Sequence, residues 1–496
     1  MNDEKKWRGA PHEEDKPGER FFPREKKRAA MPRAAGEPAK TPRRQTRATV
    51  AIARTSERFR DEASITRLVE EALGHLGGIE TFVKPGQTVL IKPNQTGYFL
   101  ADEGMTTDPR LVAALIKLAQ GAGAKRVIVG ESSGMDSTRL VMEATGMAAT
   151  ARAAGAEVVS FDESEQVEVE IPGGKALRKI ALPRELAEAD VILNACKGKT
   201  HHMDPISGAI KNYVGAIPLK LRMQHHDAKT FAEYVDIMSV RKPAVNICDA
   251  IIIGEGDGPV ANTPRWCGCV LASTDPVALD TTICRLFSLD PAKHNFAAEA
   301  AERGLGTNDT NEIEIVGARL EEARIEVRQP RQGWDYMPFN VIVGKQVTYS
   351  GTLGHWKSIA DAFLKDGTWV KVMATSGIPT FLIGEAEDPE FERHVKQGPY
   401  IVIDDAAPER YQLDPRVHFV PGHPALHNML PEILKGLGLT VPGNLSKRAA
   451  EAARFGEARL LYVPGRQTAK EATMLGLAVL GAGTLAYAAW KAIKAA

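Results

Sequence analysis

The chain has 496 residues, 43% of them hydrophobic and 25% charged, which is enough for about two to four folded domains. Its 63 basic residues balance 63 acidic residues, so the composition excludes a generic nucleic-acid binder, and no nucleic acid is expected as a partner. The five cysteines include no CxxC pair, which excludes a disulfide scaffold, a zinc ribbon and a ferredoxin-type iron-sulfur cluster. We therefore expect a cytoplasmic protein with reduced, buried cysteines.

Residues 1–46 are expected to form a disordered basic tail. They contain 13 Lys and Arg against 8 Asp and Glu, together with six prolines and almost no aliphatic periodicity. Such a segment cannot bury enough apolar surface to offset the entropy that it would lose on folding.

From residue 47 onwards, short apolar runs alternate with helical runs. The runs at 49–54, 88–93 and 126–131 are apolar along most of their length, as expected of strands that are covered on both faces. Helices are expected to start at Asp108-Pro109 and Asp275-Pro276, where an aspartate cap precedes a proline in the first helical position. This alternation predicts an α/β fold with largely parallel sheets covered by helices.

A second α/β block follows the first. Its predicted strands are NVIVG, WVKVMA, TFLIGE, YIVIDD and VHFVPG between residues 340 and 422, and its predicted helices lie near 355–365 and 424–437. We therefore expect two lobes with a ligand between them. The predicted boundaries are 1–46 for the tail, 47–305 for the lobe that carries the site motifs, 306–445 for the second lobe, 446–471 for a linker and 472–492 for an apolar helix.

The uncharged segment 472–490 allows two interpretations. As a helix its 19 residues extend about 28 Å, close to the ~30 Å hydrocarbon core of a bilayer, and such an anchor would hold the protein at the inner face of the membrane. Eleven of the 19 residues are Gly, Ala or Thr, however, so the helix could instead pack on a partner or in an oligomer. The sequence decides neither this question nor the oligomeric state.

The segment from Asn194 to Asp227 follows an apolar strand and contains four of the twelve histidines. Its glycines interrupt the helical pattern on both sides, which indicates a structured loop at the carboxyl end of a strand, where open parallel sheets bind ligands. Imidazoles and amines in such a loop can transfer protons or bind a metal near neutral pH. The candidates are the pairs His201 with His202 and His225 with His226, and the lysines Lys199 and Lys211.

Five further residues are predicted to bind a substrate. Lys92 and Asn94 follow a strand and could hold a carboxylate or a phosphate, although a plain loop explains them nearly as well. Thr107 stands at a helix N-terminus, which suits either an anion or an ordinary cap. Ser207 and Asn212 lie in the same glycine-containing loop as Lys199 and complete the predicted set.

Glu255 and Asp257 lie among glycines directly after another long apolar strand. Their carboxylates could bind a divalent cation, or the segment could simply turn sharply. The residues themselves leave both alternatives open.

Several separated motifs also occur in the order found in one family. The runs VLIKPN, KGKTHH, SGAIKNYVGAIP, CDAIIIGEGDGP and STDPVALD resemble the domain-of-unknown-function family 362 over about residues 48–290, with weaker likeness beyond. Many members of that family carry an appended ferredoxin-like module with two iron-sulfur clusters, for which this chain has no set of cysteines. The family name implies no reaction.

The segment from His201 to His225 is distantly similar to the nickel-pincer lactate racemase family. That resemblance implies that Lys211 anchors the cofactor, that His225 or His226 binds the metal, and that His201 is an acid or base. The racemase family has a further acid/base histidine after an early strand, where this chain has VIVGESSGMD with Glu131. The resemblance therefore does not extend to racemisation by paired histidines.

Together these observations predict an enzyme that acts on a small anionic substrate by proton transfer, assisted by a divalent metal or a metal-containing organic cofactor. The alternative is a noncatalytic protein that carries a metal, a cofactor or an iron-sulfur intermediate while it is held near a membrane. The predicted catalytic residues are His201, Lys199 and Lys211, the last also as cofactor anchor, and the predicted metal ligands are His225, His226, Glu255 and Asp257.

Overall fold

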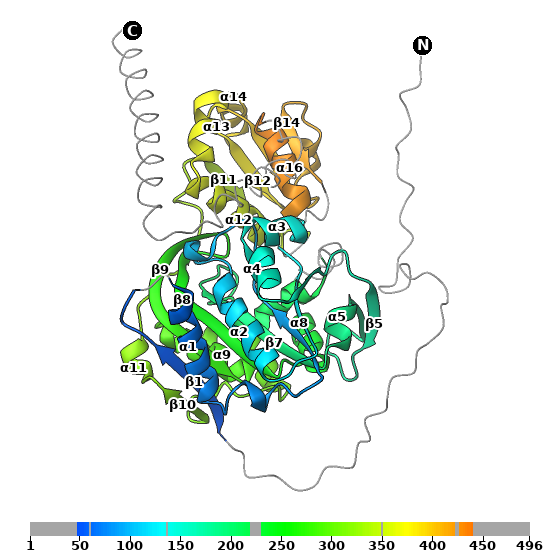
Figure 1. Cartoon of the computed structure of the whole chain (residues 1–496). Coiled ribbons are helices and arrows are strands. Elements are labelled where there is room, and N and C mark those ends of the chain that lie inside the picture. Colours follow the sequence, from blue (N-terminus) through cyan, green and yellow to red (C-terminus); the bar gives the residue numbers. More distant parts are fainter. Residues whose placement is uncertain are drawn as a thin grey trace. The chain divides into compact units, whose positions relative to one another are not determined.

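Two β-sheets with helices on their faces, and a separate hairpin, form the described part of the chain (Figure 1). This computed structural model describes residues 47–58, 61–134, 137–218, 230–348, 351–421 and 426–439. The tail at 1–46, the linker at 446–471 and the apolar helix at 472–492 that the sequence predicts lie outside these residues. Among the described residues, the search for a helix of sufficient length and hydropathy to cross a bilayer finds none.

The larger sheet has eight strands: β1 (Ala48–Arg54), β2 (Thr88–Lys92), β3 (Arg126–Glu131), β4 (Glu157–Ser160), β7 (Val191–Lys199), β8 (Val245–Asp257), β9 (Ala261–Ser273) and β10 (Ile313–Gly317). Their order in the sheet is β10-β1-β9-β8-β7-β2-β3-β4. Neighbours are parallel except that β9 runs antiparallel to β1 and β8. The predicted α/β fold is confirmed, but this sheet is mixed, because residues 258–260 are too short a link between β8 and β9 for a parallel crossover.

Two predictions about this sheet need correction. Glu255 and Asp257 were expected in a loop, but they lie within β8 and pair with Thr263 and Ala261 of β9. Pairing with β9 keeps this glycine-containing stretch extended. The first lobe was expected to end at residue 305, yet β10 lies beyond that position and pairs in parallel with β1.

The helices of this lobe are α1 (Glu62–Gly74), α2 (Pro109–Gly121), α3 (Thr138–Ala144), α4 (Met147–Ala153), α5 (Arg184–Glu188), α6 (Gly208–Lys211), α8 (Thr230–Val240), α9 (Pro276–Leu286), α10 (Asn295–Glu302) and α11 (Leu320–Ala323). Short 3-10 turns are η1 (Ile79–Thr81), η2 (Ala101–Glu103), η3 (Asn212–Ala216) and η4 (Pro291–Lys293), and the separate hairpin is β5 (Gln166–Glu170) with β6 (Lys179–Pro183). The predicted helix starts are confirmed: Asp108 caps α2 and Asp275 caps α9, each ahead of a proline.

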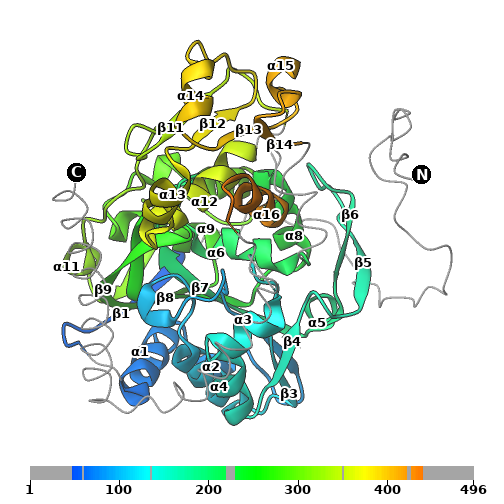
Figure 2. The ribbon, with the colours of Figure 1, turned by 90° about the horizontal axis from the view of Figure 1, so that it is seen from above.

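Helices cover both faces of the larger sheet because its strands are apolar on both faces. Side chains alternate along a strand, so Val89 and Ile91 of β2 pack with α1, α2 and α4, whereas Leu90 packs with α5, α8 and α10. Figure 2 shows α1, α2 and α4 on one side of the strands and α6, α8 and α9 on the other. All five cysteines are buried, as the sequence predicted.

The smaller sheet has four parallel strands in chain order: β11 (Asn340–Val343), β12 (Thr380–Ile383), β13 (Tyr400–Ile403) and β14 (Val417–Val420). Its helices are α12 (Thr352–Lys365), α13 (Thr368–Ser376), α14 (Phe391–Gln397), α15 (Glu409–Gln412) and α16 (Leu426–Gly436). The run WVKVMA was expected to be a strand and forms α13 instead. Trp369 and Val372, three positions apart, are buried in the aromatic core of this lobe, while Val370 is 68% exposed, which is helical periodicity.

Candidate functional site

The predicted site residues lie at the carboxyl ends of neighbouring strands of the larger sheet. β2 lies between β7 and β3 and is parallel to both, so the three strands end at one edge. Lys92 is the last residue of β2, Glu131 of β3 and Lys199 of β7. Open α/β sheets bind ligands at such an edge, and the chain continues from β7 through α6 and η3 along it.

Lys199 is 1% exposed, and its Nζ donates three hydrogen bonds. The acceptors are Asn94 Oδ1 at 2.9 Å, Thr96 Oγ1 at 2.5 Å and the carbonyl oxygen of Met105 at 2.7 Å. All three are neutral oxygens. Burial, reinforced by the positive charge of Lys211, lowers the pKa of Lys199 well below its ordinary value.

A chain of asparagine side chains links this lysine to β7 and β8. Asn94 Nδ2 donates to Asn212 Oδ1 at 3.0 Å, Asn212 Nδ2 donates to Asn194 Oδ1 at 2.8 Å, and Asn194 Nδ2 donates to Asn246 Oδ1 at 2.8 Å. Asn94 and Asn212 were predicted from the sequence, whereas Asn194 and Asn246 were not. The signal that could have found them is an asparagine inside an otherwise apolar strand, because a buried amide needs partners.

Lys92 forms a buried ion pair rather than an open binding group. Its Nζ lies 2.7 Å from Glu131 Oε2, and the two side chains are 0% and 2% exposed. Glu131 Oε1 accepts a hydrogen bond from the backbone N–H of Ser132 at 2.8 Å. Gly215 of η3 covers the pair so closely that an added Cβ would lie 1.7 Å from Glu131 Oε1. This arrangement does not support the predicted substrate contact of Lys92.

Thr107 and Ser207 differ in what their contacts support. Thr107 Oγ1 donates to the carbonyl of Ala195 at 2.8 Å and accepts from the backbone N–H of Asn94 at 2.9 Å, so it ties the loop after β2 to β7. Those bonds give Thr107 a structural role, and its predicted substrate contact stays a prediction. The backbone N–H of Ser207 donates to the carbonyl of Lys199 at 3.0 Å, so Ser207 lies next to the backbone of Lys199 and stays a candidate.

His201 and His202 stack with ring centres 4.9 Å apart. His201 is 4% exposed, and its Nδ1 accepts from the backbone N–H of Met203 at 3.0 Å, so Nε2 carries the proton of the neutral ring. His202 Nδ1 lies 2.7 Å from the carbonyl oxygen of Gly258 and donates to it. Burial lowers the pKa of His202 to about 4, which keeps this imidazole neutral at physiological pH.

Lys211 lies close to Lys199 and to His202. Its positive charge contributes to the lowered pKa of Lys199 and of His202, and its Nζ lies 5.9 Å from the centre of the Phe296 ring. Because His202 stacks on His201, these interactions bring the predicted catalytic residues His201, Lys199 and Lys211 into one region of the lobe.

The carboxylates of Glu255 and Asp257 are held by arginines. The bonds are Glu255 Oε2 with Arg265 Nη1 at 3.0 Å, Glu255 Oε1 with Arg328 Nε at 2.9 Å, and Asp257 Oδ2 with Arg331 Nε at 2.8 Å. These contacts do not support the predicted metal-binding role of the two residues. Within the described ranges, no group of three or more His, Cys, Asp and Glu side chains could hold a metal ion. The other predicted ligands, His225 and His226, lie outside those ranges.

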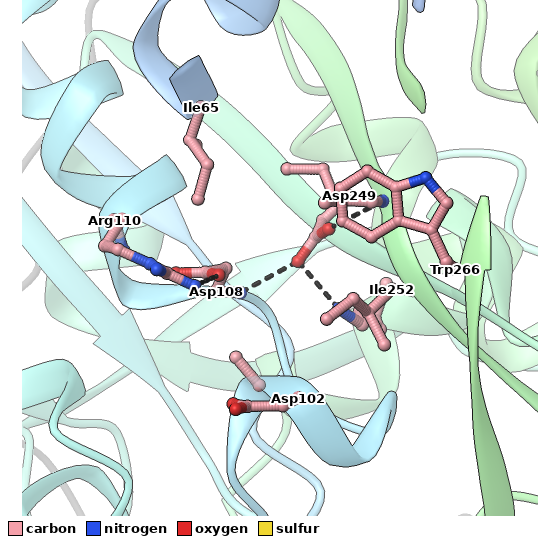
Figure 3. A pocket seen from close by; sticks show the side chains of 10 residues that line it. Ile65, Asp102, Asp108, Arg110, Asp249, Ile252 and Trp266 are labelled. Carbon is pink, nitrogen blue, oxygen red and sulfur yellow. Dashed lines mark hydrogen bonds and ion pairs between the residues drawn. The ribbon is translucent and has the colours of Figure 1, made fainter. Parts of the chain in front are cut away.

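A small pocket, partly open to solvent, lies where β8 and β9 face α1 and the start of α2 (Figure 3). Asp249 lies between Asp108 and Trp266, and its Oδ2 accepts from Lys197 Nζ at 2.9 Å and from the backbone N–H of Asp108 at 2.8 Å. Arg110 pairs with Asp108 at 2.6 Å. Lys197 precedes Lys199 by two positions on β7. The pocket therefore lies next to the polar edge, by which we mean the carboxyl ends of β2, β3 and β7.

Comparisons with known proteins place the chain in a family. The family model described as domain of unknown function (DUF362) matches residues 89–285. A thylakoid-associated protein of Synechocystis sp. is 34% identical over 254 residues, which make up 50% of this chain and 76% of that protein. The chain belongs to the DUF362 family. The match to the family model spans β2 through most of α9 and therefore includes Lys92, Asn94, Lys199, Lys211 and Asn212.

The lactate racemase apoprotein from Thermoanaerobacterium thermosaccharolyticum is a match among solved structures. It is 12% identical, the comparison covers 80% of this DUF362 chain and 91% of that one, and the TM-score is 0.31. With a TM-score this low, the comparison supports neither a shared fold nor a shared reaction.

Proposed function

We propose that the edge formed by β2, β3 and β7 binds a small anionic substrate next to Lys199. A buried amine whose acceptors are all neutral oxygens is costly to keep charged, and an anion at its side offsets that cost. Lys211 adds a second positive charge nearby. The observation that carries this proposal is the burial of Lys199 against three neutral oxygens.

The same surroundings support proton transfer as the reaction. A lysine whose pKa is lowered well below its ordinary value can take a proton from a bound substrate and return it. His201 is the second proposed acid or base, because it follows Lys199 by two positions and an imidazole can exchange a proton near neutral pH. Ser207, beside Lys199, and the amide of Asn212 are proposed to orient the substrate.

Assistance by a divalent metal or a metal-containing cofactor remains a proposal from the sequence. The residues that would hold it are Lys211, His225 and His226, and the role of such a group would be to polarise the substrate. The described residues offer no set of three ligands, and the two histidines lie outside them. The proposed proton transfer therefore uses only side chains of this protein.

Replacing Lys199 by methionine is expected to slow proton exchange by about 100-fold or more, the usual contribution of a positioned acid or base. The probes are three 2-hydroxy acids, lactate, glycerate and malate. Each is incubated with the protein in D₂O, and loss of the proton on the carbon beside the carboxylate is followed by NMR. Methionine keeps most of the length of the lysine side chain and removes its charge and its proton.

The matched control is Lys125→Met, which removes an exposed lysine directly before β3 in the same lobe. It should exchange the probes at the rate of the unchanged protein. If the Lys199→Met protein exchanges the probes as fast as the unchanged protein, Lys199 is not the proposed acid or base. Absence of exchange with every probe in the unchanged protein would reject proton transfer on 2-hydroxy acids.

A second candidate function is a noncatalytic role at a membrane. The observation that favours it is the Synechocystis relative, which is named as thylakoid-associated. The segment 472–490 would supply the apolar contact with the bilayer. In this role the polar edge would hold a metal, a cofactor or an iron-sulfur intermediate for delivery.

Deleting residues 466–496 is expected to move the protein from the membrane pellet to the supernatant, because the deletion removes the apolar segment. The measurement is ultracentrifugation of lysed cells followed by immunoblotting of both fractions. An alkaline carbonate wash of the full-length protein tells insertion, which resists the wash, from peripheral attachment. A truncated protein that pellets as fully as the parent contradicts the anchor.

A further inference from the structure

The side chain of His294, at the start of α10, lies between two buried aspartates. Its Nδ1 contacts Asp204 Oδ2, its Nε2 lies 3.4 Å from Asp280 Oδ2, and all three side chains are 0% exposed. Burial by itself lowers the pKa of His294, but the hydrogen bonds and charges of Asp204 and Asp280 outweigh it and raise the pKa to about 9. A charged imidazolium therefore joins two carboxylates that come from different parts of the chain.

Both carboxylates also bind backbone N–H groups: Asp204, itself part of the loop after β7, holds the start of α10, and Asp280 holds α6. Asp204 Oδ1 accepts from the backbone N–H and the Nδ2 of Asn295 at 2.9 and 2.8 Å. Asp280 accepts from the backbone N–H groups of Ala209 at 2.5 Å and Ile210 at 3.0 Å, which are the second and third residues of α6. The two ends of the segment 204–210 are therefore tied to the same histidine through its two aspartates.

Gly208 allows Asp280 to approach this segment. Its φ is +58°, a conformation that other residues rarely adopt. An added Cβ would lie 2.5 Å from the Asp280 carboxylate. The short helix α6 has only four residues, so it depends on outside partners for its geometry.

The third contact of α10 is with Lys211 itself, the last residue of α6. Phe296 presents its ring to Lys211 at 5.9 Å from Nζ to the ring centre. His294, Asn295 and Phe296 are consecutive, so the first turn of α10 contacts both ends of the loop and the lysine that it carries.

We propose that His294 is a positioning residue, which through Asp204 and Asp280 fixes α6 and so places Lys211 beside Lys199 and the histidine pair. This inference rests on the proposed function, because it assigns to Lys211 a defined place at the substrate site. His294 contacts neither Lys199 nor Lys211 in the bonds described above, so it acts through the two aspartates and the backbone that they hold.

The test is His294→Gln, since glutamine is uncharged and cannot bridge both carboxylates. Hydrogen–deuterium exchange measured by mass spectrometry should become about tenfold faster or more in the peptide that spans 204–211, while exchange in β7 stays unchanged. Acetylation of Lys211 by acetic anhydride should also become about tenfold faster relative to the exposed Lys125 of the same molecule. Neither readout needs a substrate, so both remain valid if the proposed function fails.

The matched control is His394→Gln in the other lobe. His394 is also buried and also contacts an aspartate, with Nδ1 2.7 Å from Asp388 Oδ2. This control should leave exchange at 204–211 and acetylation of Lys211 unchanged. Equal acceleration in the peptide 204–211 and in β7 would indicate general loss of stability and overturn the positioning role, as would a folded His294→Gln protein with unchanged readouts.

Discussion

Substituting Glu131 by glutamine should lower the free energy of unfolding by about 3–5 kcal/mol, the usual cost of leaving a buried charge without its partner. The pair with Lys92 spans 2.7 Å and is shielded from solvent. A glutamine side chain has one oxygen, so either Lys92 or the backbone N–H of Ser132 loses its acceptor. Urea denaturation followed by circular dichroism measures the change.

The matched control is Glu157→Gln, the same substitution in an ion pair at the other end of β3. Arg126 and Glu157 are 44% and 54% exposed, so losing this pair should cost about 0–1 kcal/mol. Replacing both members of the buried pair, Lys92→Met with Glu131→Leu, should cost less than Glu131→Gln alone, because no buried charge is left. If Glu131→Gln lowers the free energy of unfolding no more than Glu157→Gln does, Lys92 is again a candidate substrate ligand.

The sequence was sufficient to predict the α/β class because the strands of the larger sheet are apolar on both faces. It was not sufficient to predict the direction of β9, because the apolar pattern of a buried strand is the same in parallel and antiparallel pairing. The three-residue link at 258–260 was the available signal, since it allows a hairpin and no crossover helix. A six-residue run such as WVKVMA was likewise too short to distinguish a strand from α13.

Residues of the candidate site that lie in one loop could be predicted together. His201, Lys199 and Lys211 are close in sequence and follow one strand, so their proximity needs only that strand and its loop. Lys92 and Glu131 are 39 positions apart, and their pairing depends on β3 lying next to β2 in the sheet. Ion-pair partners of this kind follow from strand order, which the apolar pattern does not specify.

The same reason explains why the arginine contacts of β8 could not be predicted. Glu255 and Asp257 were candidates for a metal because carboxylates among glycines suit a cation. Their arginine partners include Arg328 and Arg331, which are 73 and 74 positions away and come from the segment after α11. Carboxylate spacing alone cannot distinguish a metal site from an arginine pair, because both satisfy the same negative charge.

The free energy of unfolding is expected to fall by about 3 kcal/mol between pH 6.5 and about 9 through His294. The pKa of His294 is about 9 in the folded protein, and the ordinary value is 6.5. Below pH 6.5 both states are protonated and the stabilisation by Asp204 and Asp280 is fully present. As the pH rises through this window, the unfolded chain loses its proton first, so stability is lost until the folded protein also titrates. Urea denaturation at a series of pH values measures this slope.

The His294→Gln variant separates this slope from those of other groups. It should be less stable than the parent at pH 6.5, and the difference between the two should shrink as the pH rises towards 9. The buried cysteine thiols, whose pKa values are raised, contribute equally to both proteins and cancel in that difference. His202 has a pKa of about 4 when folded, so its contribution is lost only as the pH falls below 6.5. A difference that stays constant from pH 6.5 to 9 would show that His294 is not held as an imidazolium between the two aspartates.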